Sequence, residues 1–97
     1  MATEAQIEGL LQRMRKMSAA DISVLEARSQ TPDSSMTATP GSQNEALWSE
    51  MAELGWMVIK EDAIDLTGGK RYVMKTYTIS TEGLQPIVNL LSTLSRE

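Results

Sequence analysis

The side chains best suited to catalysis are scarce in this sequence of 97 residues. It contains no histidine and no cysteine, which removes the commonest general base, the commonest metal ligand and the thiolate nucleophile. The stretch TGGK at 67–70 lacks the spacing and the following Ser or Thr of a phosphate-binding loop. Glu61, Asp62 and Asp65 are close in sequence, but alternation along a strand points Asp62 away from the other two. We therefore predict a protein that is not an enzyme and that uses no cofactor or metal.

The net charge of −4 is unevenly distributed along the chain. Residues 1–28 and 56–97 each carry equal numbers of acidic and basic side chains. Residues 29–55 contain only acidic ones, namely Asp33, Glu45, Glu50 and Glu53. The acidic middle segment is therefore a candidate contact surface for a partner with a basic surface.

Two amphipathic helices are expected in the first part of the chain. Thr3 and Gln6 form a capping box for a helix over 4–17, and its apolar stripe is Ile7, Leu10, Leu11, Met14 and Met17. Leu10, Met14 and Met17 lie beside basic residues and are candidates for dimerisation or docking, with packing into the protein's own core as the alternative. Ser18 caps a second helix over 18–28, whose expected buried contacts are Ile22, Val24 and Leu25.

A segment rich in Ser, Thr and Pro separates these helices from the rest of the chain. Residues 29–43 contain too few apolar side chains to offset the entropy of ordering them, which predicts a flexible linker. A third helix then begins at Ser42 or Asn44 and ends at Gly55, which tolerates left-handed backbone geometry. Its inward face is expected to hold Ala46, Leu47, Met51 and Leu54, with Trp48 at the border.

The last part of the chain predicts a β-hairpin followed by a helix. Residues 56–67 and 70–79 are rich in β-branched and aromatic residues and flank the turn at Gly68-Gly69. A two-residue turn pairs Val58 with Ile79, Lys60 with Tyr77, Asp62 with Lys75, Ile64 with Val73 and Asp65 with Tyr72. Ser80 or Thr81 caps the final helix, whose stripe is Leu84, Ile87, Val88, Leu91 and Leu94. The expected fold is a single α+β domain over 1–97, in the order helix, helix, linker, helix, hairpin, helix.

Three phrases in residues 47–91 resemble the C-terminal half of a winged-helix domain. They are Leu54-Gly55-Trp56, the hairpin around Gly68-Gly69, and YTISTEG at 77–83. This phrasing is similar to that of MarR-type and related bacterial or phage regulators. The first half departs from the pattern, because the 29–43 linker stands where a DNA-binding helix-turn-helix has a turn of about three or four residues.

The resemblance implies DNA binding, whereas the charges favour a protein partner. A DNA-reading helix needs Lys and Arg near phosphates, but the third helix presents Glu45, Ser49, Glu50 and Glu53. We therefore expect a winged-helix-like regulator or adaptor that acts through protein–protein contact, as a monomer or homodimer. In the alternative, a DNA-binding transcription regulator, the contacts would be Gln43 and Asn44 to base edges, and Lys60, Lys70, Arg71 and Lys75 to phosphates. The sequence shows neither a signal peptide nor a membrane span, so a cytoplasmic location is expected.

Overall fold

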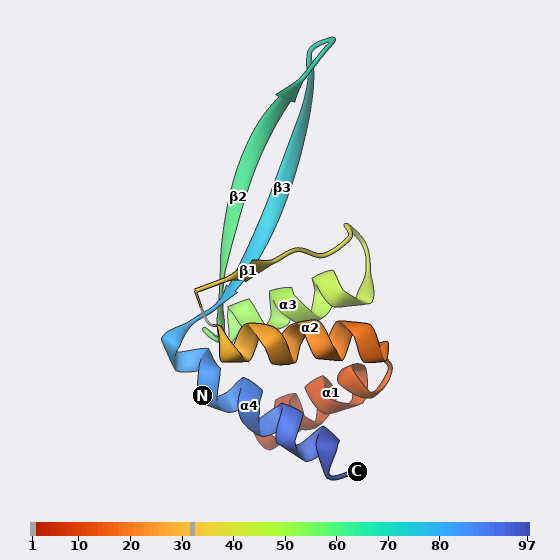
Figure 1. Ribbon diagram of the computed structural model, residues 1–97, viewed down its shortest axis with the longest axis vertical. Helices are drawn as coiled ribbons and strands as arrows, with labels where there is room; N and C mark the ends of the chain where they lie inside the picture. The colour runs from red at the N-terminus through yellow and green to blue at the C-terminus, as the bar shows by residue number, and fades with distance from the viewer. Residues whose placement is uncertain (1, 32) are drawn as a thin grey trace.

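A bundle of helices and a long β-hairpin make up the two parts of the molecule (Figure 1). The computed structural model describes residues 2–31 and 33–97. Within these residues the helices are α1 (Glu4–Arg15), α2 (Ala19–Gln30), α3 (Gln43–Glu53) and α4 (Thr81–Ser95). The strands are β1 (Ser35–Met36), β2 (Met57–Leu66) and β3 (Lys70–Ile79), which form one antiparallel sheet in the order β1-β3-β2. The expected α+β class is confirmed.

Each helix begins at a hydroxyl side chain that the sequence marks as a cap. The Oγ or Oγ1 atoms of Thr3, Ser18, Ser42 and Ser80 each accept a hydrogen bond from the backbone N–H three residues later. The predicted capping box is present, because the Gln6 side chain also accepts a bond from the Thr3 N–H, at 2.8 Å. The helix ends are less predictable: α1 ends at Arg15, before the expected boundary at 17, and α2 extends to Gln30, beyond the expected 28.

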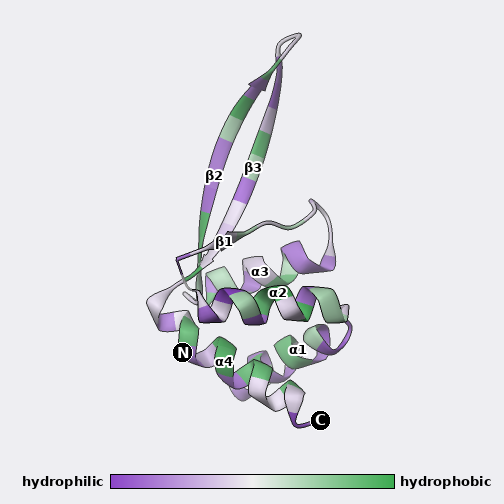
Figure 2. Ribbon diagram, in the orientation of Figure 1, coloured by the Kyte–Doolittle hydropathy of each residue, from purple (hydrophilic) through white to green (hydrophobic). Residues whose placement is uncertain are grey.

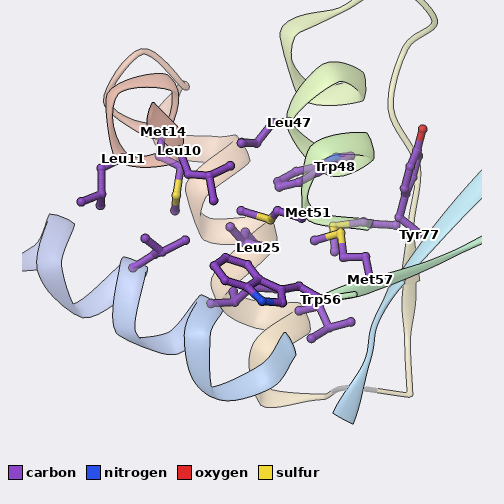
Figure 3. Packing of buried hydrophobic residues seen from close by; sticks show 14 residues of the cluster. Leu10, Leu11, Met14, Leu25, Leu47, Trp48, Met51, Trp56, Met57 and Tyr77 are labelled. Atoms are coloured by element: carbon purple, nitrogen blue, oxygen red, sulfur yellow. The ribbon is translucent and has the colours of Figure 1, made fainter. Parts of the chain in front are cut away.

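The core lies where all four helices meet the base of the hairpin (Figure 3). Its largest fully buried side chains are Trp48, Tyr77, Leu10, Met14, Leu25, Leu47, Met51 and Ile87. Trp48 is thus a central core residue rather than the border residue expected from the sequence. Val24 and Ala46, which were expected to be buried, are exposed.

The segment expected to be a flexible linker contains a short strand. Ser35 pairs with Thr78, and Met36 pairs with Tyr77. Met36 is buried in the core, which explains why this part of a polar segment is ordered. The described residues between α2 and α3 form no helix, so α2 and α3 are not joined by the short turn of a helix-turn-helix.

The hairpin forms with a register that differs by one residue from the prediction. Met57 pairs with Ile79, and the last pair is Leu66 with Lys70. The turn therefore spans three residues, Thr67-Gly68-Gly69, and not the two glycines alone. Both glycines have positive φ, +87° and +76°, a conformation open to glycine at little cost. Because the extra turn residue shifts every pair, the predicted pairs of Asp62 with Lys75 and Ile64 with Val73 are wrong.

The junction between α3 and β2 is a Schellman motif, as the predicted stop at Gly55 suggests. The Gly55 N–H donates to the Ala52 carbonyl oxygen, and the Trp56 N–H donates to that of Met51. Gly55 has φ +82°. This motif turns the chain sharply from the end of the helix into the hairpin.

The start of α4 is fastened directly to this junction. The Ser80 N–H donates to the Trp56 carbonyl oxygen at 2.9 Å, and the Ser80 hydroxyl donates to the Gly55 carbonyl oxygen at 2.6 Å. Gly83 is buried one turn into α4, and a Cβ added there would lie 2.0 Å from the Trp56 carbonyl oxygen. We call these contacts of Gly55, Trp56, Ser80 and Gly83 the clasp.

The clasp predicts a strong penalty for replacing Gly83. Gly83→Ala would place a methyl group against the Trp56 backbone, which cannot yield as a flexible side chain could, and should lower the free energy of unfolding by about 3 kcal/mol. Urea unfolding followed by circular dichroism measures the change.

The matched control is Gly9→Ala, because Gly9 lies inside α1 with no heavy atom within 4 Å of an added Cβ. That variant should be more stable by about 0.5–1 kcal/mol. Equal effects of the two substitutions would contradict the close approach of α4 to Trp56.

Candidate functional site

The hairpin extends far beyond the helices that hold its base (Figure 1). The molecule measures 50 × 25 × 24 Å along its principal axes, and the hairpin lies along the longest one. Every residue from 58 to 73 is exposed. We call residues 60–75, which comprise the distal parts of β2 and β3 with their turn, the arm.

The register sorts the arm's side chains into two faces, because successive residues of a strand point to opposite sides. Odd-numbered residues form one face, which carries two cross-strand ion pairs with the pair of Ala63 and the exposed Val73 between them. Arg71 Nε lies 3.2 Å from Asp65 Oδ1, and Lys75 Nζ lies 3.9 Å from Glu61 Oε1. All four side chains are largely exposed, so these pairs satisfy the charges locally and contribute little stability.

Even-numbered residues form the opposite face, which we call the even face. Ile64 and Tyr72 are a direct cross-strand pair, and Leu66 follows Ile64 on the same side. Their exposed fractions are 42%, 47% and 50%. Figure 2 shows hydrophobic bands on both strands far from the helices, and residues of both faces contribute to them. The even face also carries the charges of Lys60, Asp62 and Lys70, so it combines an apolar centre with a small excess of positive charge.

The acidic residues proposed for partner binding lie on or near α3, and two of them make contacts within the protein. Glu50 forms an ion pair with Arg13 of α1. Glu45 Oε1 accepts a hydrogen bond from the Gly41 N–H at 3.1 Å, which holds the loop before α3. Ser49 is half-buried and Glu53 is exposed. The sequence could not reveal that a base from a distant helix covers part of this acidic face.

The residues proposed for DNA binding do not converge on one surface. Gln43 and Asn44 lie at the start of α3 in the helical part, whereas the four basic residues lie on the hairpin. The bases themselves are divided, with Lys60 and Lys70 on the even face and Arg71 and Lys75 on the other. Asn44 is half-buried, whereas Gln43 is exposed.

The residues proposed for dimerisation lie mainly inside the protein. Leu10 and Met14 are buried in the core, and Met17 is partly buried against it. For Leu10 and Met14, the structure thus follows the alternative of packing into the protein's own core. The grouping of exposed apolar side chains on the arm was not predicted from the sequence. The predicted register paired even-numbered with odd-numbered residues and so mixed the two faces of the hairpin.

The part of the chain that the structure describes contains no cluster of acidic residues arranged to hold a metal ion. Among residues 2–31 and 33–97, no helix has the length and apolar character needed to cross a membrane.

Comparisons with protein-family models, curated proteins and solved structures find no match.

The shifted pKa values lie away from the arm, where α1 meets the last residue of the chain. Arg15 Nε lies 2.9 Å from Glu97 Oε1 and 3.1 Å from Oε2, and Arg15 also pairs with Glu8. The hydrogen bonds from Arg15 hold the pKa of the Glu97 side chain below its ordinary value. They also raise the pKa of Arg15. The link between α1 and the residues after α4 therefore depends on the charge of Glu97.

This link predicts a pH dependence that NMR can measure. A carboxyl group with a lowered pKa in the folded state stabilises that state above its ordinary pKa, and the contribution is lost as the pH falls through the lowered value. A titration of the Glu97 carboxyl carbon should show the low pKa, and Arg15→Gln should raise it toward the ordinary glutamate value. Arg13→Gln, on the same helix but paired with Glu50, should leave it unchanged. An unshifted pKa in the unmodified protein would contradict the Arg15–Glu97 pairing.

Proposed function

We propose that this chain is a non-enzymatic regulatory or adaptor protein that binds another protein through the even face of the arm. The observation that carries the proposal is the exposed apolar group of Ile64, Leu66 and Tyr72 at the far end of the hairpin. The order α3, β2, β3, α4 is compatible with a winged-helix-like arrangement, in which the hairpin corresponds to the wing.

The stability of an isolated ribbon supports this assignment. A two-stranded hairpin in water is at best marginally stable without a further layer to pack against. Here residues 58–73 are all exposed, yet they carry large apolar side chains on both strands. Exposed apolar patches that are large for a monomer mark interaction sites. A partner that covers the even face would supply the missing layer.

The charges of the even face indicate the chemistry of the partner surface. Lys60 and Lys70 flank the apolar centre, and Asp62 is the single acid on that face. We therefore propose a partner with an apolar groove bordered by carboxylates. The sequence had suggested a partner with a basic surface that binds the acidic third helix. We favour the arm because Glu45 and Glu50 of that helix already make contacts inside the protein.

A second candidate function, DNA binding, is favoured by one observation. Lys70 and Arg71 lie beside the turn at the tip of the hairpin, where a wing could reach a phosphate. Against it, Asp65 neutralises Arg71, and the helical part contributes no basic residue between 29 and 55. Binding of a random duplex that weakens with salt, and that is lost in Lys70→Glu/Arg71→Glu, would support DNA binding.

Site-specific photo-crosslinking tests the proposed function. A photo-reactive amino acid replaces Tyr72 on the even face in one variant and Ile7 on α1 in another, and both proteins are produced in the native cells. The Tyr72 probe should give discrete protein adducts that the Ile7 probe does not give. Adducts from both positions, or from neither, would contradict the proposal, and an adduct with DNA alone would favour the second candidate.

Replacing Ile64 tests whether apolar contact on the even face stabilises the complex with the partner. Ile64→Ser in the Tyr72 probe variant removes apolar surface from the even face and should reduce the adduct at least about tenfold, as expected for the loss of a central apolar contact. The matched control is Ile7→Ser, since Ile7 is similarly exposed at 36% but lies on the helical part. That control should leave the adduct unchanged.

A further inference from the structure

The outer edge of β2 runs along the arm without a neighbouring strand in the part of the chain that the structure describes. The sheet order β1-β3-β2 places β2 at an edge, and Figure 1 shows only β3 beside its distal part. β2 is ten residues long, contains no proline and pairs with β3 without a bulge. Residues 58–66 are all exposed. Such an edge is a template for pairing with a strand of another chain.

The ladder between β2 and β3 shows which residues carry the free backbone groups. The Ser80 N–H donates to the Trp56 carbonyl oxygen, so residue 56 directs its carbonyl group toward β3. Hydrogen-bonded and non-hydrogen-bonded pairs alternate along an antiparallel ladder, and the even-numbered residues of β2 therefore bond to β3. The N–H and C=O groups of the odd-numbered residues from 57 to 65 point outward. Two copies of β2 can bond through these groups only if odd-numbered residues lie opposite odd-numbered residues.

Lys60 and Asp62 are the charged residues of β2 whose cross-strand neighbours carry no charge. Glu61 and Asp65 form ion pairs with bases of β3, whereas Lys60 and Asp62 lie opposite uncharged residues. Among residues 2–31 and 33–97, neither Lys60 nor Asp62 forms an ion pair. A strand that pairs with the outer edge of β2 could supply a charged partner for both.

Like charges exclude most of the ways in which two copies of β2 could pair about a two-fold axis. An axis at Lys60 places the two Lys60 side chains opposite each other, and an axis at Asp62 does the same for the two Asp62 side chains. An axis at Ala63 places Glu61 of each copy opposite Asp65 of the other. An axis nearer to either end of β2 would pair no more than about half of the strand.

An axis at Glu61 brings opposite charges together. It places Lys60 of each copy opposite Asp62 of the other, so that both charges gain a partner. It also places Val58 of each copy opposite Ile64 of the other, and apolar cross-strand pairs stabilise a sheet. The two Glu61 side chains meet on the odd-numbered face, where each is already paired with a base of β3.

We propose that this chain forms a homodimer through antiparallel pairing of the two β2 strands about a two-fold axis at Glu61. The two arms then form one sheet in the order β3-β2-β2-β3. A sheet of three or more strands with an apolar face is stable where an isolated hairpin is marginal. The contact uses the edge of β2 and leaves the even face open, so it stands or falls separately from the proposed function.

Reciprocal charge substitutions, followed by sedimentation equilibrium, test the dimer and its register. Lys60→Asp places carboxylates opposite each other at two points of the dimer and should weaken self-association at least about tenfold. Lys60→Asp/Asp62→Lys restores opposite charges between the copies and should restore the association. The matched control is Lys70→Asp, since Lys70 has the same charge and the same face but lies on β3, and it should leave the association unchanged.

Three results would overturn the proposal. A protein that stays monomeric at millimolar concentration would exclude the dimer. A dimer that Lys60→Asp does not weaken, or that the double substitution does not restore, would exclude the register.

A single cysteine gives a geometric test, because the chain has no cysteine of its own. Opposite Cα atoms of a hydrogen-bonded antiparallel pair lie about 5.5 Å apart, which suits a disulfide. Glu61→Cys should therefore give disulfide-linked dimers on mild oxidation. Asp65→Cys is the matched control, since Asp65 is exposed on the same face and is also paired with a base of β3. In the proposed register its two copies lie about 26 Å apart, and equally fast crosslinking of both variants would overturn the register.

Discussion

The close approach of α4 to the Trp56 backbone is the constraint on which the rest of the structure depends. Gly83 leaves room for the Trp56 carbonyl oxygen, and Ser80 hydrogen-bonds to the carbonyl oxygens of both Gly55 and Trp56. Ser80 also caps α4 by accepting from the Gly83 N–H at 3.0 Å. One serine and one glycine thus fix the end of α3, the start of β2 and the start of α4 relative to one another. The direction in which the hairpin leaves the helices follows from this arrangement.

The clasp lies between two parts of the molecule, the packed core and the arm, which are stabilised by different interactions. Where the helices meet the base of the hairpin, Trp48, Tyr77 and their neighbours bury apolar surface, which supplies the main favourable free energy of folding. In the arm, where residues 60–73 are all exposed, order comes mainly from ladder hydrogen bonds and cross-strand pairs. A two-stranded ribbon without a covering layer is at best marginally stable in water. This division is the physical basis for assigning the contact surface to the arm.

Local features were predictable from the sequence, and features set by distant residues were not. The caps at Thr3 and Ser18 and the stop at Gly55 depend on nearby backbone groups, so their residue types reveal them. Strand β1 was missed, since two residues in a polar segment have no periodicity and Met36 is ordered by a core built elsewhere. The predicted register was wrong by one residue because Thr67 belongs to the turn. That one residue decides which side chains of β2 and β3 share a face of the hairpin. Contacts between distant residues were also hidden from the sequence: charge counts showed that α3 is acidic, but they could not show that Arg13 pairs with Glu50 or that Ile64 lies opposite Tyr72.

The most direct test of this account is to remove the arm and measure the stability of what remains. Residues 61–75 are replaced by Asn-Gly, which closes the hairpin after the pair of Lys60 with Thr76 by a favoured two-residue turn. Thermal unfolding and the NMR spectrum of core methyl groups are then compared with those of the full chain. The account predicts cooperative unfolding within a few degrees of the full chain and unchanged core signals, since the clasp and the core are intact. Loss of cooperative unfolding would show that the helices need the arm, and would contradict its assignment as a projecting element for partner binding.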